Sequence, residues 1–353
     1  MKKAAALLII ILSLSLFPWG CAPKKTFNRY TGTIFETFDT MIQITAYTNN
    51  KGEFDHYYNM ARGRFQQLHK LFDIYHDYPG LNNIKTINDH AGIKPVRVEG
   101  EVIDLIAFSQ KWCGHTGGKA NIALGPLLEI WHDYRTKGMA NPEIATVPPL
   151  KILREAMLHT DINNVVVDKA QSTVFLTHQG MALDVGAVAK GFAVEIVARE
   201  LAAAGLGAGV INAGGNVRTI GIPPDGREKW AIGIEDPTGS TGIFATLNIG
   251  EGAVVTSSGQ QRYYVVDGEV LHHIIDPKTL WPASFYQAVT VVAPDSGLAD
   301  FLSTALFLLP YTEGHELSEE LEDVEVIWVM PGGEIKSTKG LEAMINTHNG
   351  SGK

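Results

Sequence analysis

The sequence predicts an α+β fold in which antiparallel sheets pack against helices. Helix-like and strand-like segments alternate along the 353 residues without the regular strand–helix–strand spacing of a parallel sheet. Strand-like segments then dominate from about residue 209 to residue 292. Hydrophobic residues make up 45% of the chain, which is enough for a large core or for two closely packed subdomains. We expect a single domain over residues 30–345 and a disordered tail over residues 346–353.

The expected elements can be placed in order along the chain. After a polar spacer over residues 22–29, the strand-like run TMIQITAY predicts the first strand. Apolar residues at helical spacing predict the helices, and the long amphipathic helix that begins near Ala187 ends at Gly205. The expected helices cover residues 54–75, 102–112, 125–134, a short stretch up to His159, 187–204 and 298–309. The expected strands cover residues 40–47, 164–168, 173–177, several segments within 209–292, and 324–330.

The first 21 residues resemble an export signal. Lys2 and Lys3 precede an apolar run over residues 4–17, and Gly20 before Cys21 matches a lipoprotein cleavage site. The apolar run is shorter than the roughly 20 residues that a membrane-spanning helix needs. We expect a lipid on Cys21 and an exported body anchored to a membrane, facing the periplasm or the extracellular side. A plain secretory signal or an uncleaved anchor is the alternative.

The chain is acidic and has few cysteines. Its formal net charge is −9 and it has no continuous basic stretch, so we expect no nucleic-acid partner. An anionic small substrate would need a local cation or a helix N-terminus. If Cys21 carries lipid, Cys113 has no disulfide partner, and its apolar surroundings favour a buried packing thiol.

The segment 271–279, with the sequence LHHIIDPKT, gathers polar groups at the end of a predicted strand. His273 and Asp276 stand beside a turn that a proline fixes. Because a histidine ordinarily titrates near neutral pH, His273 is the favoured general base, ahead of Asp276. Two alternatives stay open. His273 could position a ligand, or the segment could be an ordinary junction in which Asp276 caps the turn.

The segment 299–306 offers a candidate metal site. Asp300 and Thr304 are four residues apart, so on a helix both side chains project from the same face. Their neighbours are mostly apolar, and a buried carboxylate needs a partner. A carboxylate, a hydroxyl and a backbone carbonyl together suit Mg²⁺. In the structural alternative, Thr304 bonds the carbonyl of Asp300, and Asp300 caps the helix.

The segment 183–191, with the sequence LDVGAVAKG, predicts an anion site. A strand ending at Leu183 is expected to turn into the long helix, whose free N–H groups and dipole attract negative charge. Lys190 lies one turn in and could reach a phosphate, while Asp184 could bond a ribose or a base edge. A solvated surface lysine is the alternative. The glycines within 212–216 would let the backbone approach a flat ligand, or would merely form a hairpin.

Seven motifs, in order between about residues 35 and 309, together resemble the ApbE family of FAD:protein FMN transferases. Two positions depart from the family pattern: Asn121 stands where many relatives have aspartate, and Leu280 stands where glycine is usual. The matching segments are 38–40, 121–127 with Trp131, 183–191, 212–216, 256–259 with Arg262, 272–279 and 299–304.

The resemblance implies Mg²⁺-dependent cleavage of the FAD pyrophosphate, transfer of FMN to a threonine or serine of a partner protein, and release of AMP. It also implies two similar T-fold-like subdomains. The expected acceptors are subunits of Rnf-type or Na⁺-translocating NADH:quinone reductase-type redox pumps, or extracellular electron-transfer flavoproteins. The implied metal ligands are Asp300, Thr304 and the Ala187 carbonyl; His273 and Asp276 are the catalytic candidates; and the FAD site would include Phe38, Lys119, Ala120, Asn121, Asp184, Lys190, Arg262, His273 and Ile274.

Two other functions fit the same motifs. With water as the acceptor, the chain would be an FAD pyrophosphatase that releases FMN and AMP. A lipoprotein that binds and stores flavin without turnover is the non-catalytic alternative. Storage needs no metal beside a scissile pyrophosphate, so the presence of both Asp300 and Thr304 favours an enzyme.

Overall fold

A computed structural model describes residues 27–237, 242–260 and 262–347, and its central element is one eight-stranded antiparallel sheet. The strand order is β1-β2-β6-β7-β10-β15-β16-β17. Every neighbouring pair of strands in this sheet is antiparallel. The strands are β1 (Asn28–Thr37), β2 (Thr40–Thr48), β6 (Ala208–Ala213), β7 (Asn216–Gly221), β10 (Gly252–Ser258), β15 (Ala288–Ala293), β16 (Glu325–Val329) and β17 (Ile335–Ser337).

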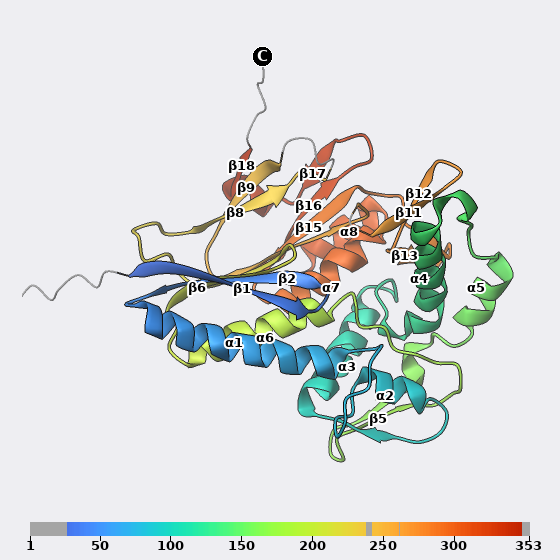
Figure 1. The fold of residues 1–353 in the computed structure, drawn as a ribbon. Coiled ribbons are helices and arrows are strands. Elements are labelled where there is room, and N and C mark those ends of the chain that lie inside the picture. Colours follow the sequence, from blue (N-terminus) through green and yellow to red (C-terminus); the bar gives the residue numbers. More distant parts are fainter. Residues whose placement is uncertain (1–26, 238–241, 261, 348–353) are drawn as a thin grey trace, which may run out of the picture.

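Three helices cover one face of this sheet, and a small sheet covers the other (Figure 1). The helices are α1 (Lys51–Phe72), α6 (Ala189–Ala203) and α7 (Ser296–Phe307). Alternation along β2 buries Ile42 and Ile44 against the helices, because successive strand residues point to opposite faces. The small sheet has the order β18-β9-β8, with β8 (Trp230–Glu235), β9 (Ile243–Ile249) and β18 (Ile345–Thr347).

Shorter elements at one end of the large sheet carry most of the remaining motifs (Figure 1). Helix α4 (Gly125–Ala140) packs against the hairpin of β11 (Tyr263–Val266) and β12 (Glu269–His272). The other elements there are α2 (Ile84–Asp89), α3 (Gly100–His115), α5 (Leu150–Met157), β3 (Val96–Arg97), β4 (Val165–Asp168), β5 (Thr173–Leu176), β13 (Ile275–Asp276) and β14 (Trp281–Pro282). Helix α8 (Tyr311–Glu319) instead packs beside α7 against Trp328 of β16.

The structure confirms the predicted α+β class with antiparallel sheets, and the predicted burial of Cys113. That thiol is 2% exposed, and burial raises its pKa to about 11. Within residues 27–237, 242–260 and 262–347, no helix is long and apolar enough to span a membrane. The expected signal and Cys21 lie outside the described residues. The division into two similar subdomains stays a prediction.

Three local predictions were wrong, and two helices were missed. Strand β1 already starts at Asn28, inside the expected spacer, and helices α2 and α8 were not expected. No strand ends at Leu183: its N–H bonds the Asn88 side chain at 2.7 Å, and the Asp184 N–H bonds the Ile122 carbonyl at 2.7 Å. The expected disordered tail starts too early, because residues 346 and 347 pair with β9. Residues 348–353 of that tail lie outside the described part.

Candidate functional site

The candidate metal ligand Asp300 lies on the buried side of α7 and contacts the start of α6. Its Oδ2 accepts a hydrogen bond from the Gly191 N–H at 2.7 Å, and its Oδ1 lies 3.2 Å from Lys190 Nζ. The residue is only 6% exposed. A Cβ at position 191 would lie 2.4 Å from the Asp300 Cβ, so glycine is required where the two helices meet. The two sequence motifs therefore form one site.

The residues around Asp300 fit a hard cation. Thr304 follows one turn later on α7, and its hydroxyl lies 3.3 Å from Ser257 Oγ. Because Gly191 donates its N–H to Asp300, that N–H does not bond the Ala187 carbonyl four residues earlier, and no other described backbone N–H donates to it. A carboxylate, a hydroxyl and a free carbonyl are oxygen donors of the kind Mg²⁺ takes. The assignment of Asp300, Thr304 and the Ala187 carbonyl as metal ligands stays a prediction.

The structural alternative for Asp300 and Thr304 does not hold. Asp295 is the residue that caps α7, accepting from the Leu298 N–H at 2.8 Å. The bond back to the Asp300 carbonyl comes from Ser303 Oγ at 2.9 Å. Asp300 and Thr304 are therefore not needed for helix capping.

A second cluster forms where the β11–β12 hairpin meets the segment before α6. Tyr263 pairs with His272 in the hairpin, so Arg262 and His273 stand opposite each other at its open end. The Nδ1 atom of His273 is buried and has no hydrogen-bond partner among the described residues. Burial, followed by the charges of Arg262 and Arg135, lowers the pKa of His273 to about 3. The imidazole is therefore neutral at pH 7.

This pKa contradicts the reason for which the sequence favoured His273 as a base. An ordinary histidine pKa near neutrality was assumed, whereas burial beside two arginines disfavours the imidazolium. The neutral His273 can still accept a proton, but it is a weaker base than an ordinary histidine.

The neutral state of His273 is directly measurable. In NMR titrations, the His273 ring resonances of the ligand-free protein should keep their neutral shifts from pH 8 down to about pH 4, because the pKa is about 3. The spectrum of His273→Gln identifies the resonances. A midpoint between pH 6 and pH 7 for His273 would contradict the buried, arginine-flanked environment.

Asp184 lies next to the same cluster. Its Oδ1 accepts from the Gly186 N–H at 2.8 Å, and burial raises the pKa of its carboxyl. His132, Arg135 and Arg262 are close enough to act on it electrostatically. Asp184 therefore joins the segment before α6 to the His273 cluster.

Three members of this cluster were not predicted from the sequence. Arg135 on α4 donates from Nη2 to His132 Nδ1 at 2.9 Å, and the His132 ring lies 5.9 Å from the ring of Tyr75. Nothing in the local sequence distinguishes them from a solvated helix face and a loop. Only the packing of α4 on the hairpin brings Arg135 towards Arg262.

Asp276, the second catalytic candidate, is engaged structurally. It is 3% exposed, and its Oδ1 lies 2.9 Å from Lys119 Nζ and accepts from the Lys278 N–H at 3.0 Å. This is the turn-capping arrangement that the sequence left as an alternative. Lys119 is correspondingly occupied by the ion pair. Both side chains are thus suited to fixing the β13–β14 turn.

The neighbouring Asn121 also has a structural role. Its Oδ1 accepts from the Ala123 N–H at 2.8 Å, and its Nδ2 donates to the Thr160 carbonyl at 2.9 Å. Ala120 before it is 2% exposed. The segment reaches the site through its backbone, because the Ile122 carbonyl bonds the Asp184 N–H.

Phe38 lies in the turn between β1 and β2. Phe38 and Asp39 both adopt the left-handed conformation, with φ of 55° and 49°, which is uncommon outside glycine. Thr40 beyond them abuts Gly214 of the β6–β7 turn, where a Cβ would meet the threonine Oγ1 at 2.2 Å. Burial, followed by the charges of Asp184 and Asp39, raises the pKa of Tyr75.

His272 and Ile274 hold His273 in place. His272 Nε2 donates to the Ala283 carbonyl at 2.7 Å, and its Nδ1 accepts from the Ile274 N–H at 3.2 Å, which fixes the neutral tautomer. Ile274 is 6% exposed. A Cβ at Gly259 would approach His272 to 2.4 Å, so this glycine allows the imidazole to pack there.

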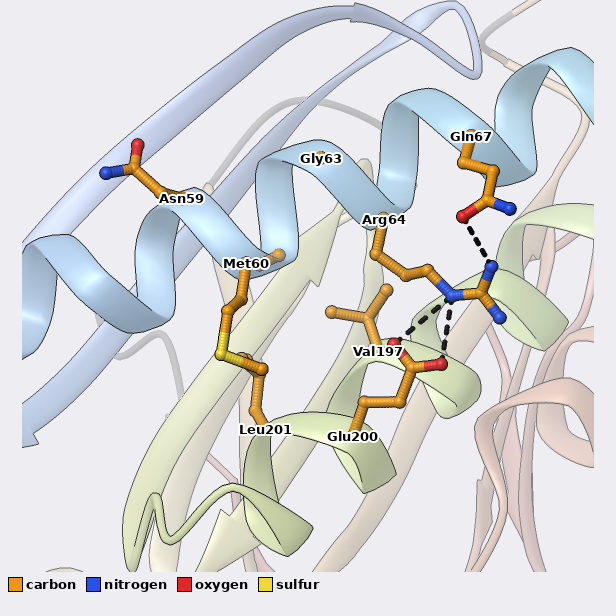
Figure 2. Close-up of a pocket in the computed structure, with 9 residues that line it drawn as sticks. Asn59, Met60, Gly63, Arg64, Gln67, Val197, Glu200 and Leu201 are labelled. Atoms are coloured by element: carbon orange, nitrogen blue, oxygen red, sulfur yellow. Dashed lines mark hydrogen bonds and ion pairs between the residues drawn. The ribbon is translucent and has the colours of Figure 1, made fainter.

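A separate pocket of about 340 Å³ lies between α1 and α6 (Figure 2). Arg64 spans it, with its Nε 2.9 Å from Glu200 Oε1 and its Nη1 donating to Gln67 at 2.8 Å. None of the residues that line it belongs to the two clusters above. The ion pair between Arg64 and Glu200 joins α1 to α6, so Arg64 has a structural role.

Comparison with known proteins agrees with these motifs. The pattern of the ApbE family matches residues 38–328. The chain is 32% identical over 273 residues to an FAD:protein FMN transferase of Treponema pallidum, covering 73% of each chain. It is 31% identical over 278 residues to one of Klebsiella pneumoniae, covering 78% of this chain and 84% of the relative.

Solved structures show the same architecture. The crystal structure of an ApbE protein from Thermotoga maritima superposes with a TM-score of 0.79 at 29% identity, covering 90% of this chain and 99% of that one. The flavin transferase ApbE from Vibrio cholerae, at 21% identity and a TM-score of 0.74, shares the fold over 90% of this chain and all of the other. Because the pattern of the ApbE family matches residues 38–328, which is most of the chain, the chain belongs to the ApbE family.

Proposed function

We propose that this protein is a Mg²⁺-dependent FAD:protein FMN transferase. It cleaves the pyrophosphate of FAD, attaches FMN through a phosphoester to a threonine or serine of a partner protein, and releases AMP. The observation that supports this most directly is the contact of the buried Asp300 carboxylate with Lys190 Nζ at 3.2 Å and with the Gly191 N–H at 2.7 Å, because a carboxylate beside a lysine would suit a metal ion and a phosphate. The names of the relatives from T. pallidum and K. pneumoniae support the same reaction.

The metal site and Lys190 would together neutralise the pyrophosphate. Mg²⁺ held by Asp300, Thr304 and the Ala187 carbonyl would supply positive charge against the anhydride oxygens. Lys190 Nζ lies 3.2 Å from Asp300 Oδ1. The Lys190 side chain is 25% exposed, so its ammonium group can turn towards a phosphate. Charge neutralisation and fixed orientation are the main requirements of phosphoryl transfer.

His273 would take the proton of the acceptor hydroxyl. In the proposed step, the hydroxyl oxygen bonds the FMN phosphorus, the anhydride bond to AMP breaks, and the hydroxyl proton passes to the imidazole. The ligand-free ring is a weak base because of burial and its two arginines. A bound pyrophosphate would offset those charges and raise the pKa of His273, so base strength would depend on substrate binding. Asp276 and Lys119 would position the adjoining turn.

We also propose that the protein works outside the cytoplasm. A lipid on Cys21 would hold the body at a membrane, where subunits of Rnf-type or Na⁺-translocating NADH:quinone reductase-type pumps, or extracellular flavoproteins, would be its acceptors. This rests on the charged, apolar and glycine–cysteine sequence of residues 1–21.

Intact-mass spectrometry tests the reaction. The body from residue 22 is incubated with FAD, Mg²⁺ and a threonine-bearing acceptor domain, with a matched sample containing EDTA. We expect the acceptor to gain the mass of one FMN only with Mg²⁺, accompanied by AMP. Release of free FMN and AMP, with every acceptor tried left unmodified, would instead identify a pyrophosphatase. FAD that stays bound and intact would identify flavin storage.

A further inference from the structure

We propose that the outward face of the β11–β12 hairpin is the surface on which the acceptor protein docks. The inference rests on the proposed function, because transfer of FMN to a protein requires a surface that holds that protein at the site. The face is formed by Tyr263, Val265 and Val270, none of which belongs to the seven sequence motifs.

A tight turn fixes the pairing of the two strands. Val266 pairs with Glu269, so the loop consists of Asp267 and Gly268 alone. Their φ angles are 50° and 84°, and a two-residue type I′ turn requires positive φ at both positions. Because a change of register would move every side chain to the other face, this turn determines which residues point outward.

The two faces of the hairpin have different surroundings. On the inner face, the cross-strand pair of Tyr264 and Leu271 is 3% and 4% exposed and packs in a cluster with Trp131 of α4. Successive strand residues alternate between faces, so the next cross-strand pair, Val265 and Val270, points the other way. These two valines are 44% and 55% exposed.

Tyr263 extends the outward face towards the candidate site. It lies two residues before Val265 on the same strand, so it shares that face, and it is 43% exposed. Its cross-strand partner is His272. This end of the face therefore adjoins Arg262 and His273 along the chain. A protein that brings a hydroxyl to His273 would cover the outward face at the same time.

The hairpin stands apart from the other sheets. Within residues 27–237, 242–260 and 262–347, β11 and β12 pair only with each other, and the hairpin lies at the periphery beside α4 (Figure 1). Single exposed apolar side chains are common on proteins, whereas several on one face mark an interaction site. The pair of valines and the tyrosine are such a group.

Size and charge favour a transient protein partner. A stable dimer buries about 800 Å² per partner, and three half-exposed side chains supply only a small part of that area. The turn carries the exposed carboxylates of Asp267 and Glu269, which anionic lipid would repel. An enzyme must release each modified acceptor, so a small apolar contact with a polar rim suits the acceptor protein.

Acceptor binding can be measured without turnover. A threonine-bearing acceptor domain is immobilised on a biosensor, and the protein is applied with FAD and EDTA. Val265→Thr and Val270→Thr should each weaken binding by about 10-fold, as expected for residues at the centre of an interface. Threonine keeps the branched shape and the strand preference of valine, so the affinity for FAD, measured by calorimetry, should not change.

The same variants should divide the kinetic constants of the transfer reaction. Their KM for the acceptor should rise by about the same factor, while kcat and the KM for FAD stay unchanged, because the lost contact contributes equally before and during the reaction. Val166→Thr is the matched control. Val166 is a valine of β4 that is 48% exposed and lies outside the hairpin, so its replacement should change none of these values.

Three results would overturn the docking surface. The first is acceptor binding by the hairpin variants that equals wild type. The second is a loss of FAD affinity as large as the loss of acceptor affinity. The third is a different occupant: a dimer in analytical ultracentrifugation, or binding to phosphatidylglycerol vesicles, that Val265→Thr abolishes.

The outcome is separable from the proposed reaction. If the acceptor domain binds through the two valines and is never flavinylated, the docking surface stands and the transferase proposal fails. If flavinylation occurs and Val265→Thr and Val270→Thr leave the acceptor KM unchanged, the transferase stands and the docking surface fails. A wild-type protein that neither binds nor modifies any acceptor domain overturns both.

Discussion

Replacing Asp300 by asparagine should lower Mg²⁺-dependent FMN transfer by about 100- to 1,000-fold, the range seen when a preorganised charge-stabilising group is removed. Asparagine keeps the shape of the side chain and can still accept from the Gly191 N–H. It removes the negative charge that would bind the cation and that now pairs with Lys190 at 3.2 Å. Initial rates at saturating FAD and acceptor, measured across a range of Mg²⁺ concentrations, give the size of the effect.

Asp295→Asn is the matched control for this change. Asp295 caps the same helix and pairs with Arg199 at 2.8 Å, and asparagine is an equally good helix cap. Its transfer rate should stay near that of the wild type. An Asp300→Asn protein with wild-type unfolding behaviour and an undiminished rate would exclude Asp300 as a metal ligand.

Replacing Glu195 by glutamine should destabilise the fold by about 3–5 kcal/mol, the usual cost of breaking a buried ion pair from one side. Glu195 is 4% exposed and accepts from Arg218 at 2.9 Å, from Arg199 at 2.8 Å and from the Ser296 N–H at 2.8 Å. The substitution leaves the buried Arg218 with only the exposed Glu251 carboxylate, at 3.5 Å, as a counter-charge, and it loosens the start of α7. The loss is measured as the free energy of unfolding in urea.

The control lies one and a half turns further along α6. Glu200→Gln also breaks a pair with an arginine, but the Glu200 side chain is 43% exposed, so a loss of about 1 kcal/mol or less is expected. Equal losses for Glu195→Gln and Glu200→Gln would show that burial of the Glu195–Arg218 pair does not determine the effect.

The Glu195 carboxylate also makes part of the free energy of unfolding depend on pH. Burial alone would raise the pKa of Glu195, but the bonds from Arg218, from the Ser296 N–H and from Arg199 outweigh burial and hold it below the ordinary value of 4.5. A lowered carboxyl pKa stabilises the folded state fully above that ordinary value, and the contribution is lost as the pH falls through the lower, folded pKa. Wild type should therefore lose stability on acidification more steeply than Glu195→Gln.

The sequence predicted the parts of the site that follow helical spacing or strand-to-turn patterns. Asp300 and Thr304 on one helix face, and Lys190 at a helix start, need only local geometry to be recognised. Arg135 needs tertiary information, because its charge matters only once α4 packs on a hairpin from the other half of the chain. The pKa of His273 was mispredicted for the same reason, since burial and two distant arginines determine it.

The prediction of secondary structure from the sequence failed where side chains or distant strands provide the hydrogen-bond partners of the backbone. The segment before Asp184 looks like a strand, but its N–H groups bond the Asn88 side chain and the Ile122 carbonyl. Strand β1 is interrupted by a bulge between Ile34 and Thr37, which breaks the alternation that would identify it. Strand β18 forms by pairing with β9. The sequence of residues 345–347 alone gives no indication of that pairing.

The strand order of the large sheet sets the time at which the site can form during folding. Strand β2 pairs with β6, although α1 to α6 and the three short strands β3, β4 and β5 lie between them in the chain. Pairings of such long sequence separation require costly loop closure and slow folding. The residues around Asp300 and His273 meet only after these long loops close and α7 docks. A newly made chain therefore becomes competent for ligand only late, and premature capture of flavin by a partly folded chain is disfavoured by topology alone.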